Sequence, residues 1–306
     1  MKLGICLPHY GRAIEPSRLI QLATRAEEMG LDSLWVTDHV VVPRDVPLIY
    51  RDEMLDPLAV LPWLAGVTER IALGTSVIVL PYRSPLPVAK LLASVDVLSS
   101  GRLIVGVAVG WLEVEFAALG VPFRERGRRT DEAIELFQTV WTQEYPELVK
   151  GAARLPGMKV SPMPRQRPRP PILVGGASDG ALRRAARLGD GWHASSMPPA
   201  TFRASALAVS NYWKEFKREG EPELTLRIPL LIEGAHRPAV DATLLGSRHA
   251  LRGSLASIAR ELRQYQSAGC SHVALEVSYS TYPAILDSID LIAEELRPAL
   301  AQPRER

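Results

Sequence analysis

Residues 172–195 read ILVGGASDGALRRAARLGDGWHAS, and this stretch decides the fold. It opens with a short apolar run, which is typical of a strand that is buried on both faces. Alanine and leucine then recur at helical spacing through residues 179–188, and Gly189 stands where a helix would end. A second apolar run covers residues 191–195. A strand, a helix and another strand in so short a stretch predict one parallel β/α unit.

The same alternation runs along the whole chain. Strands are predicted at Leu3–Leu7, Ser33–Thr37, Ile71–Val77, Leu103–Val109, Ile172–Gly175, Gly191–Ser195, Leu226–Ile232 and His272–Val277. Helices are predicted at Pro16–Met29, Pro57–Thr68, Pro85–Leu98, Thr130–Trp141, Asp179–Leu188, Ala200–Arg218, Leu255–Ala268 and Tyr282–Leu296. Eight consecutive units favour an α/β fold of the closed (β/α)₈ TIM-barrel type, with residues 1–306 as one domain.

An open doubly wound sheet is the alternative fold. Its phosphate-binding glycine fingerprint should follow the first strand, but the sequence there is Leu-Pro-His-Tyr-Gly. The closed barrel is therefore preferred. Residues 144–171, which are rich in proline, arginine and glycine, interrupt the rhythm and are expected to form a surface insertion, because the β/α pattern resumes after them.

Composition narrows the function classes. The chain has 306 residues, 47% of them hydrophobic and 23% charged, with a formal net charge of +2. A net charge this small gives no overall electrostatic field that would attract nucleic acid or a membrane surface. Two cysteines are too few for a disulfide framework, and neither a signal-peptide core nor an apolar run of membrane-spanning length is present. We therefore expect a cytoplasmic enzyme that acts on a small molecule.

Function in such a barrel concentrates where the strands end. Asp38 and His39 end the second predicted strand, where a carboxylate accepts hydrogen bonds and an imidazole gives or takes a proton near neutral pH. A purely structural Asp-His pair would have the same sequence. Both interpretations stay open from the dipeptide alone.

A glycine-rich turn follows the fifth predicted strand. Gly175 and Gly176 lead through Ala177 into Ser178 and Asp179, and glycines before a helix let backbone N–H groups approach a phosphate. The alternative is a tight turn that Ser178 or Asp179 caps. The fourth strand has a similar approach, ending in Gly106-Val-Ala-Val-Gly-Trp111, for which close packing inside the barrel is the alternative.

Several other barrel chemistries lack their residues. The histidines, at positions 9, 39, 193, 236, 249 and 272, form no His-x-His pair or Cys/His cluster, so no dedicated metal site is expected. No lysine ends a predicted strand, which argues against a Schiff-base aldolase. Neither a Gly-x-Ser-x-Gly elbow nor a Walker loop is present.

Taken together, the strand-end motifs resemble those of the luciferase-like monooxygenase superfamily. The motifs are Trp35-Val-Thr-Asp-His39, Leu73-Gly-Thr-Ser-Val77, Gly106-x-x-x-Gly-Trp-Leu112 with Glu115-Phe116, Val174-Gly-Gly-x-Ser178 and Arg187-Leu-Gly-Asp-Gly-Trp192. The resemblance covers nearly the whole chain. It is closest to the branch of oxidoreductases that depend on the deazaflavin coenzyme F420.

The resemblance implies a function for each strand end. Asp38 would contact the coenzyme ring, and His39 would be the proton donor beside its reactive carbon. A bulge with a non-prolyl cis peptide at Ser76-Val77 would support the ring from behind. The remaining cofactor-binding residues would be Val79, Val109 and Gly110 along the ring, and Gly175, Gly176, Ser178 and Asp179 around the phosphate. Relatives in this superfamily also imply a homodimer.

One departure bears on the substrate. Sugar-phosphate dehydrogenases of the superfamily place a glutamate base directly after the fourth-strand glycine, where this chain has Trp111. The sequence also lacks an evident set of lysines for a substrate phosphate, so it argues against sugar-phosphate oxidation. Ala108 also replaces a glycine that is common in the related branch.

The leading hypothesis is hydride transfer between F420 and a small organic substrate, with His39 handling the proton. An FMN-dependent luciferase-like monooxygenase is the alternative, since the fold and the phosphate turn would serve it equally well. A non-redox barrel enzyme that acts on a phosphorylated metabolite, and a cofactor-binding module without activity, are more distant alternatives. The loops carry no recognisable code for the substrate.

Overall fold

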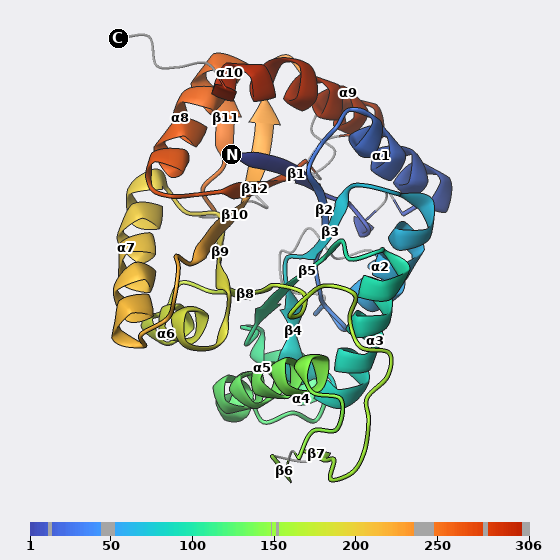
Figure 1. Ribbon diagram of the computed structural model, residues 1–306. Coiled ribbons are helices and arrows are strands. Elements are labelled where there is room, and N and C mark those ends of the chain that lie inside the picture. Colours follow the sequence, from blue (N-terminus) through green and yellow to red (C-terminus); the bar gives the residue numbers. More distant parts are fainter. Residues whose placement is uncertain are drawn as a thin grey trace.

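The computed structural model of the protein describes residues 1–11, 14–43, 53–147, 149–150, 153–235, 248–277 and 281–301. Within these residues a ring of parallel strands is surrounded by helices (Figure 1). The predicted (β/α)₈ barrel is confirmed, including the order of its strands.

The barrel closes through pairing between its first and last strands. Its members, in order around the ring, are β1 (Lys2–Cys6), β2 (Ser33–Val36), β3 (Ala72–Thr75), β5 (Leu103–Ala108), β8 (Ile172–Gly175), β9 (Gly191–Ser195), β10 (Glu223–Ile232) and β12 (His272–Glu276). Each pairs in parallel with its neighbours, and β12 pairs with β1 over five residues, from Lys2↔His272 to Cys6↔Glu276. The carboxyl ends of all these strands therefore open on one face, which we call the mouth, and their amino ends on the opposite face, the base.

Helices follow the strands and cover the outside of the barrel (Figure 1). They are α1 (Pro16–Glu28), α2 (Pro57–Val67), α3 (Pro85–Leu98), α5 (Arg126–Thr142), α6 (Asp179–Leu188), α7 (Pro199–Glu215), α8 (Leu255–Ser267) and α9 (Tyr282–Leu291). The last predicted helix, Tyr282–Leu296, continues past α9 as a π-helical turn at Ile292–Leu296 and then as α10 (Arg297–Ala301). The apolar faces of these helices supply the outer layer of the core.

Small elements are added to this frame. A short helix, α4 (Glu113–Ala118), follows β5, and a short strand, β11 (Leu251–Gly253), pairs with β10. The predicted surface insertion holds a small hairpin of β6 (Val149–Lys150) and β7 (Ala153–Arg154), which projects from the barrel in Figure 1. None of these elements was predicted, because each is too short to show a hydrophobic period.

The third strand departs from its predicted continuous run over Ile71–Val77. β3 ends at Thr75, the Ser76-Val77 peptide bond is cis, and β4 (Ile78–Val79) resumes pairing with β5. The bulge and the cis bond that the family resemblance implied are both present. The Ser76-Val77 peptide therefore lies between β3 and β4, outside both strands.

One further strand and one helix start earlier in the structure than the sequence predicted. The strand predicted at Leu226–Ile232 starts at Glu223, because β9 is available there and Glu223 pairs with Gly191. The helix predicted at Thr130–Trp141 starts at Arg126, where Arg128 and Arg129 form ion pairs with Glu125. Both arginines lie on a solvated helix surface, with side chains 57% and 41% exposed.

Glycines inside the strands mark close approaches of the backbone. A Cβ at Gly106 would stand 1.9 Å from the carbonyl oxygen of Thr75, and one at Gly74 would stand 2.3 Å from the ring of Trp35. Gly106 is therefore required for packing between β3 and β5, as the alternative interpretation of that motif held.

Among the described helices, none is both long and apolar enough to span a bilayer.

Candidate active site

A cavity of about 440 Å³ opens at the barrel mouth. Almost every residue that the sequence singled out lines it: Asp38, His39, Ser76, Val77, Val79, Val109, Gly110, Gly175, Gly176 and Ser178. The exception is Asp179. Its exposed side chain accepts a hydrogen bond from the Tyr212 hydroxyl on α7 and lies outside the cavity lining.

His39 is held by a buried carboxylate. It stands just beyond the end of β2, and its Nδ1 lies 2.9 Å from Oε2 of Glu115, a fully buried residue on α4. The Tyr82 hydroxyl donates to the same oxygen at 2.7 Å, and the N–H of Val40 donates to the other at 2.6 Å. Burial alone would raise the pKa of Glu115, but these hydrogen bonds hold it below its usual range. A carboxylate that accepts from Nδ1 favours the tautomer with the proton on Nδ1 and orients the ring.

Asp38 belongs to a separate ion pair. Its two oxygens accept hydrogen bonds from the Arg83 guanidinium at 2.6 and 2.9 Å, and the N–H of Val79 donates to one of them at 3.0 Å. Burial raises the pKa of Asp38, and the three donors oppose that shift. Arg83 also binds Asp56 before α2. Asp38 therefore fixes the backbone at Val79, beside the bulge.

The bulge is anchored from below by two buried side chains. The Ser76 hydroxyl lies 2.7 Å from Nε2 of His193, and an Arg227 N–H donates to the Ser76 carbonyl at 2.9 Å. His193 is buried, which lowers its pKa to about 3, so it is neutral near pH 7. These contacts hold the Ser76-Val77 peptide as a rigid back wall of the cavity.

The glycine turn lies at the start of α6 and lines the cavity. Gly176 has φ +114°, a conformation that favours glycine, and a Cβ there would stand 2.8 Å from Ala181. Ser178 is the N-cap of α6 and accepts the N–H of Ala181 at 3.3 Å, so the capping interpretation is confirmed. Ser178 and Gly176 also line the cavity. The turn thus presents a helix N-terminus to the cavity.

Two further lining residues, Arg227 and Arg248, belong to an Arg-Glu-Arg network. Arg227 on β10 contacts both oxygens of the fully buried Glu276, at 2.9 and 3.1 Å, and Arg248 contacts one of them at 2.6 Å. Burial would raise the pKa of Glu276, but the two guanidinium groups lower it to about 2. Both arginines line the cavity. One carboxylate thus stands between two cations.

Sequence reasoning missed most of these supporting residues: Tyr82, Arg83, Arg227 and Arg248 were not singled out as site residues. Glu115 appeared in a quoted motif and Glu276 lies within the last predicted strand, His272–Val277, but neither was assigned a partner. Charged residues inside strand and helix patterns were the available signal, since such residues are rarely fully buried without a partner.

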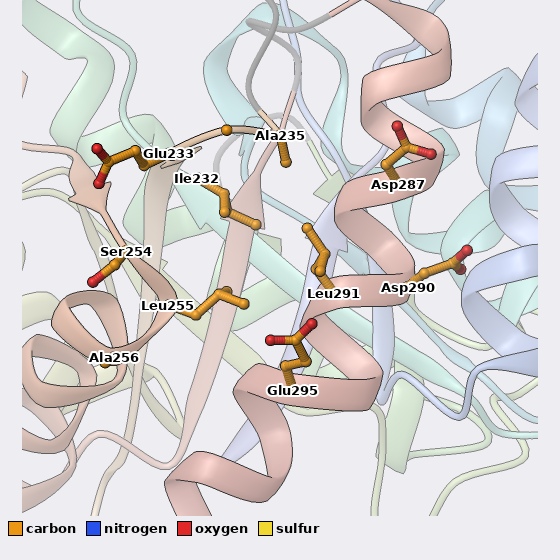
Figure 2. A pocket seen from close by; sticks show the side chains of 11 residues that line it. Ile232, Glu233, Ala235, Ser254, Leu255, Ala256, Asp287, Asp290, Leu291 and Glu295 are labelled. Atoms are coloured by element: carbon orange, nitrogen blue, oxygen red, sulfur yellow. The ribbon is translucent and has the colours of Figure 1, made fainter.

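A second, larger cavity, of about 830 Å³, lies between the end of β10, the start of α8 and α9. In Figure 2, Ile232, Leu255 and Leu291 point toward one another across it, whereas Asp287 and Asp290 point away. Asp290 accepts a hydrogen bond from Arg25. None of the site residues predicted from the sequence lines this cavity, so its size does not make it the active site.

In the described part of the chain, no group of three or more His, Cys, Asp or Glu is placed to hold a metal ion.

Comparison with known proteins identifies the fold and the family. A family profile described as luciferase-like monooxygenase matches residues 1–268. The chain belongs to this family. Solved structures with the same fold include an F420-dependent secondary alcohol dehydrogenase in complex with an F420-acetone adduct, at 18% identity and a TM-score of 0.81 over 98% of each chain. They also include the FMN-bound oxygenating constituent of 3,6-diketocamphane monooxygenase from Pseudomonas putida, at 16% identity and a TM-score of 0.80 over 99% of each chain.

Sequence relatives of this luciferase-like protein include F420-dependent glucose-6-phosphate dehydrogenases. That of Kineococcus radiotolerans is 35% identical over 185 residues, which cover 59% of this chain and 53% of the relative. That of Amycolatopsis mediterranei is 33% identical over 238 residues, covering 74% and 69%. The match thus spans about half the length of the first of these relatives.

Proposed function

We propose that this luciferase-like protein transfers a hydride between coenzyme F420 and a small organic substrate, with residues 1–306 forming one catalytic domain. The observation that supports this most directly is that one cavity joins His39 with its buried carboxylate, the Ser76-Val77 bulge and the glycine turn. Relatives named as F420-dependent dehydrogenases and a structural neighbour in complex with an F420 adduct favour the same cofactor.

The lining residues fit a ring cofactor with a phosphate. The backbone at Gly175 and Gly176, with Ser178, would hold the phosphate at the N-terminus of α6. Val79, Val109 and Gly110 would line the ring, and the bulge would support it from behind. Gly110 has φ +81°, and a Cβ there would stand 2.7 Å from Val79, so this close approach requires glycine.

F420, when bound, supplies the hydride chemistry, while the protein supplies position and proton control. His39 would give or take the proton, with its ring oriented by the contact between Nδ1 and Glu115. The proposed role of Asp38 at the ring combines with the structural one that its contacts with Arg83 and Val79 give it. Asp179, whose carboxylate binds Tyr212, would take part in phosphate binding only through its backbone.

An FMN-dependent monooxygenase is a second candidate, because a structural neighbour holds FMN in the same fold. Titrating the purified protein with F420 and with FMN, and following their fluorescence, decides between them. We expect F420 to bind with the lower Kd. A lower Kd for FMN would favour the second candidate, and binding of neither would contradict both.

The substrate, the reaction class, the oligomeric state and the location of the protein are also matters of proposal. Glucose 6-phosphate is not proposed as the substrate, because Trp111 stands where a glutamate base is expected in sugar-phosphate dehydrogenases. A non-redox enzyme would use the glycine turn without a ring, so phosphate binding without binding of F420 or FMN would favour it. A homodimer and a cytoplasmic location stay predictions from the sequence.

A further inference from the structure

Trp111 stands at the barrel mouth in a way that the buried tryptophans do not. Trp35, Trp141, Trp192 and Trp213 are buried, and each donates its indole N–H to an oxygen of the protein. Trp111 is 60% exposed, and among the residues that the structure describes its indole N–H has no hydrogen-bond partner. Both its ring and its polar group are therefore available to a ligand.

The chain around Trp111 directs this side chain away from the core. Gly110, with φ +81°, comes directly before it, and Leu112, Glu115 and Phe116 after it are buried. Packing of this segment against the barrel therefore depends on those three side chains. A tryptophan that stays largely exposed gains little from burial of its own apolar surface. Stability of the fold does not account for Trp111.

Trp111 is close to the proposed proton donor. It lines the cavity together with His39, the two ring centroids are 6.4 Å apart, and the ring planes stand at 89° to one another. Val40 and Val41, which follow His39, are 44% and 41% exposed, and their N–H groups donate to Glu115 on α4. These contacts bring the two segments together at the mouth. We call Trp111, Val40 and Val41 the apolar rim.

The charged side chains that line the cavity are engaged within the protein. Asp38 forms an ion pair with Arg83. Arg227 and Arg248 form ion pairs with Glu276. An anionic substrate would have to compete with Glu276 for the two guanidinium groups, a cationic one would have to compete with Arg83 for Asp38, and either would lose hydration on entering. The wall therefore favours a ligand without charge.

From these observations we infer that Trp111 is a specificity-determining residue, and that the substrate is an uncharged molecule whose apolar body packs on the apolar rim. The inference deepens the proposed function and rests on the same cavity. The bulge and the glycine turn would hold the cofactor, which leaves the side of His39 for the substrate. A sugar phosphate, which is anionic and exposes hydroxyl groups, fits neither the rim nor the wall.

The test uses butanamide, hexanamide and octanamide on the protein saturated with whichever cofactor binds. These probes are uncharged, share one head group and differ only in the length of the apolar chain. Burial of two further CH₂ groups should lower the Kd about tenfold from butanamide to hexanamide, and the Kd should fall again for octanamide. Octanoate has the same chain length as octanamide with a negative charge, and it should bind more weakly. Calorimetry measures each Kd.

Variants at Trp111 separate a binding role from a structural one. Trp111→Ala should reduce the tenfold step to about threefold or less, because the largest apolar surface of the rim is lost. Trp111→Phe should keep most of the step. Leu207→Ala, at a position on α7 that is 63% exposed, is the matched control and should keep the wild-type steps. Thermal melting shows whether each variant is folded, and light scattering gives its oligomeric state.

Three results would each overturn the inference: a Kd that does not depend on chain length, tighter binding of octanoate than of octanamide, or steps that Trp111→Ala leaves intact. If Trp111→Ala keeps the steps and changes the oligomeric state, the apolar rim is an interface between copies of this chain and not a substrate site.

Titrations without cofactor separate the inference from the proposed function. If neither F420 nor FMN binds but the steps and their loss in Trp111→Ala are present, the proposed function is wrong and the apolar site stands. If the cofactor binds and the steps are absent, only the inference about the substrate is wrong.

Discussion

Arg102 at the base of the barrel and three arginines at its mouth bind different kinds of partner. At the base, Arg102 donates to the carbonyl oxygens of Ala65, Thr68, Ile71 and Ser99 and to the Thr68 hydroxyl. All of these partners are neutral oxygens. At the mouth, the guanidinium groups of Arg83, Arg227 and Arg248 each bind a carboxylate.

The two kinds of partner give these arginines two different roles. A guanidinium bound to carbonyl oxygens satisfies backbone groups at the ends of elements, so it stabilises the frame and carries no specificity. A guanidinium bound to a carboxylate sets the charge of a cavity, and that charge selects ligands. We therefore expect changes at the base to alter stability, and changes at the mouth to alter binding and turnover.

The largest expected effect is at the mouth. His39→Ala removes the proton donor and should lower kcat between about 100-fold and 10,000-fold, since general acid-base groups contribute on that scale. The melting temperature should change little. Steady-state kinetics with the cofactor that binds measures the effect. His272→Gln, a change of a buried histidine at the base, is the control and should keep kcat, whereas activity of His39→Ala within twofold of the wild type would remove His39 from the mechanism.

The next effect is at the base. Arg102→Met should lower the free energy of unfolding by about 3 to 4 kcal/mol, because several acceptors would lose their donor at once. The affinity for the cofactor should be unchanged. Urea unfolding and cofactor titration measure the two quantities. Arg70→Met, in the neighbouring loop where the side chain is 70% exposed, should change neither. If Arg102→Met left the free energy of unfolding unchanged and weakened cofactor binding, the expected difference between base and mouth would be wrong.

Acid stability gives a third test at the base. Burial lowers the pKa of His272 from 6.5 to about 4. The unfolded chain therefore gains a proton below pH 6.5 that the folded protein does not accept until about pH 4, so folding stability is lost as the pH falls through this range. The loss amounts to up to about 3 kcal/mol. His272→Gln should flatten the curve of unfolding free energy against pH between 6.5 and 4, and an unchanged slope would refute this account.

The smallest effect compares two helix caps. Ser178 caps α6 inside the cavity, and Ser254 caps α8 outside it, each accepting an N–H at 3.3 Å. Replacing either by alanine should cost about 1 kcal/mol of stability. Only Ser178→Ala should also raise the Kd of the cofactor. If Ser254→Ala raises that Kd as much, the glycine turn does not hold the phosphate.

The sequence predicted the frame because the frame depends on local patterns. Apolar runs, prolines at helix starts and glycines past helix ends placed every barrel strand and the helix after it. The strand-end position of His39 and the turn at Gly176 followed from that order, and the cavity contains both. The break at Ser76-Val77 followed only from resemblance, since a bulge leaves no hydrophobic period of its own.

The pairing of charges was decided by the tertiary structure alone. Glu115 lies 76 residues from His39, Glu276 lies 49 residues from Arg227, and Arg83 lies 45 residues from Asp38. No period or spacing connects such positions, because each pair meets only when the closed barrel brings the strand ends together at the mouth. By itself the sequence determined that a barrel forms and that most of the residues singled out from it reach the mouth. Closure of the barrel decided which charged group each of these residues contacts, because contact depends on proximity in the folded protein and not along the chain.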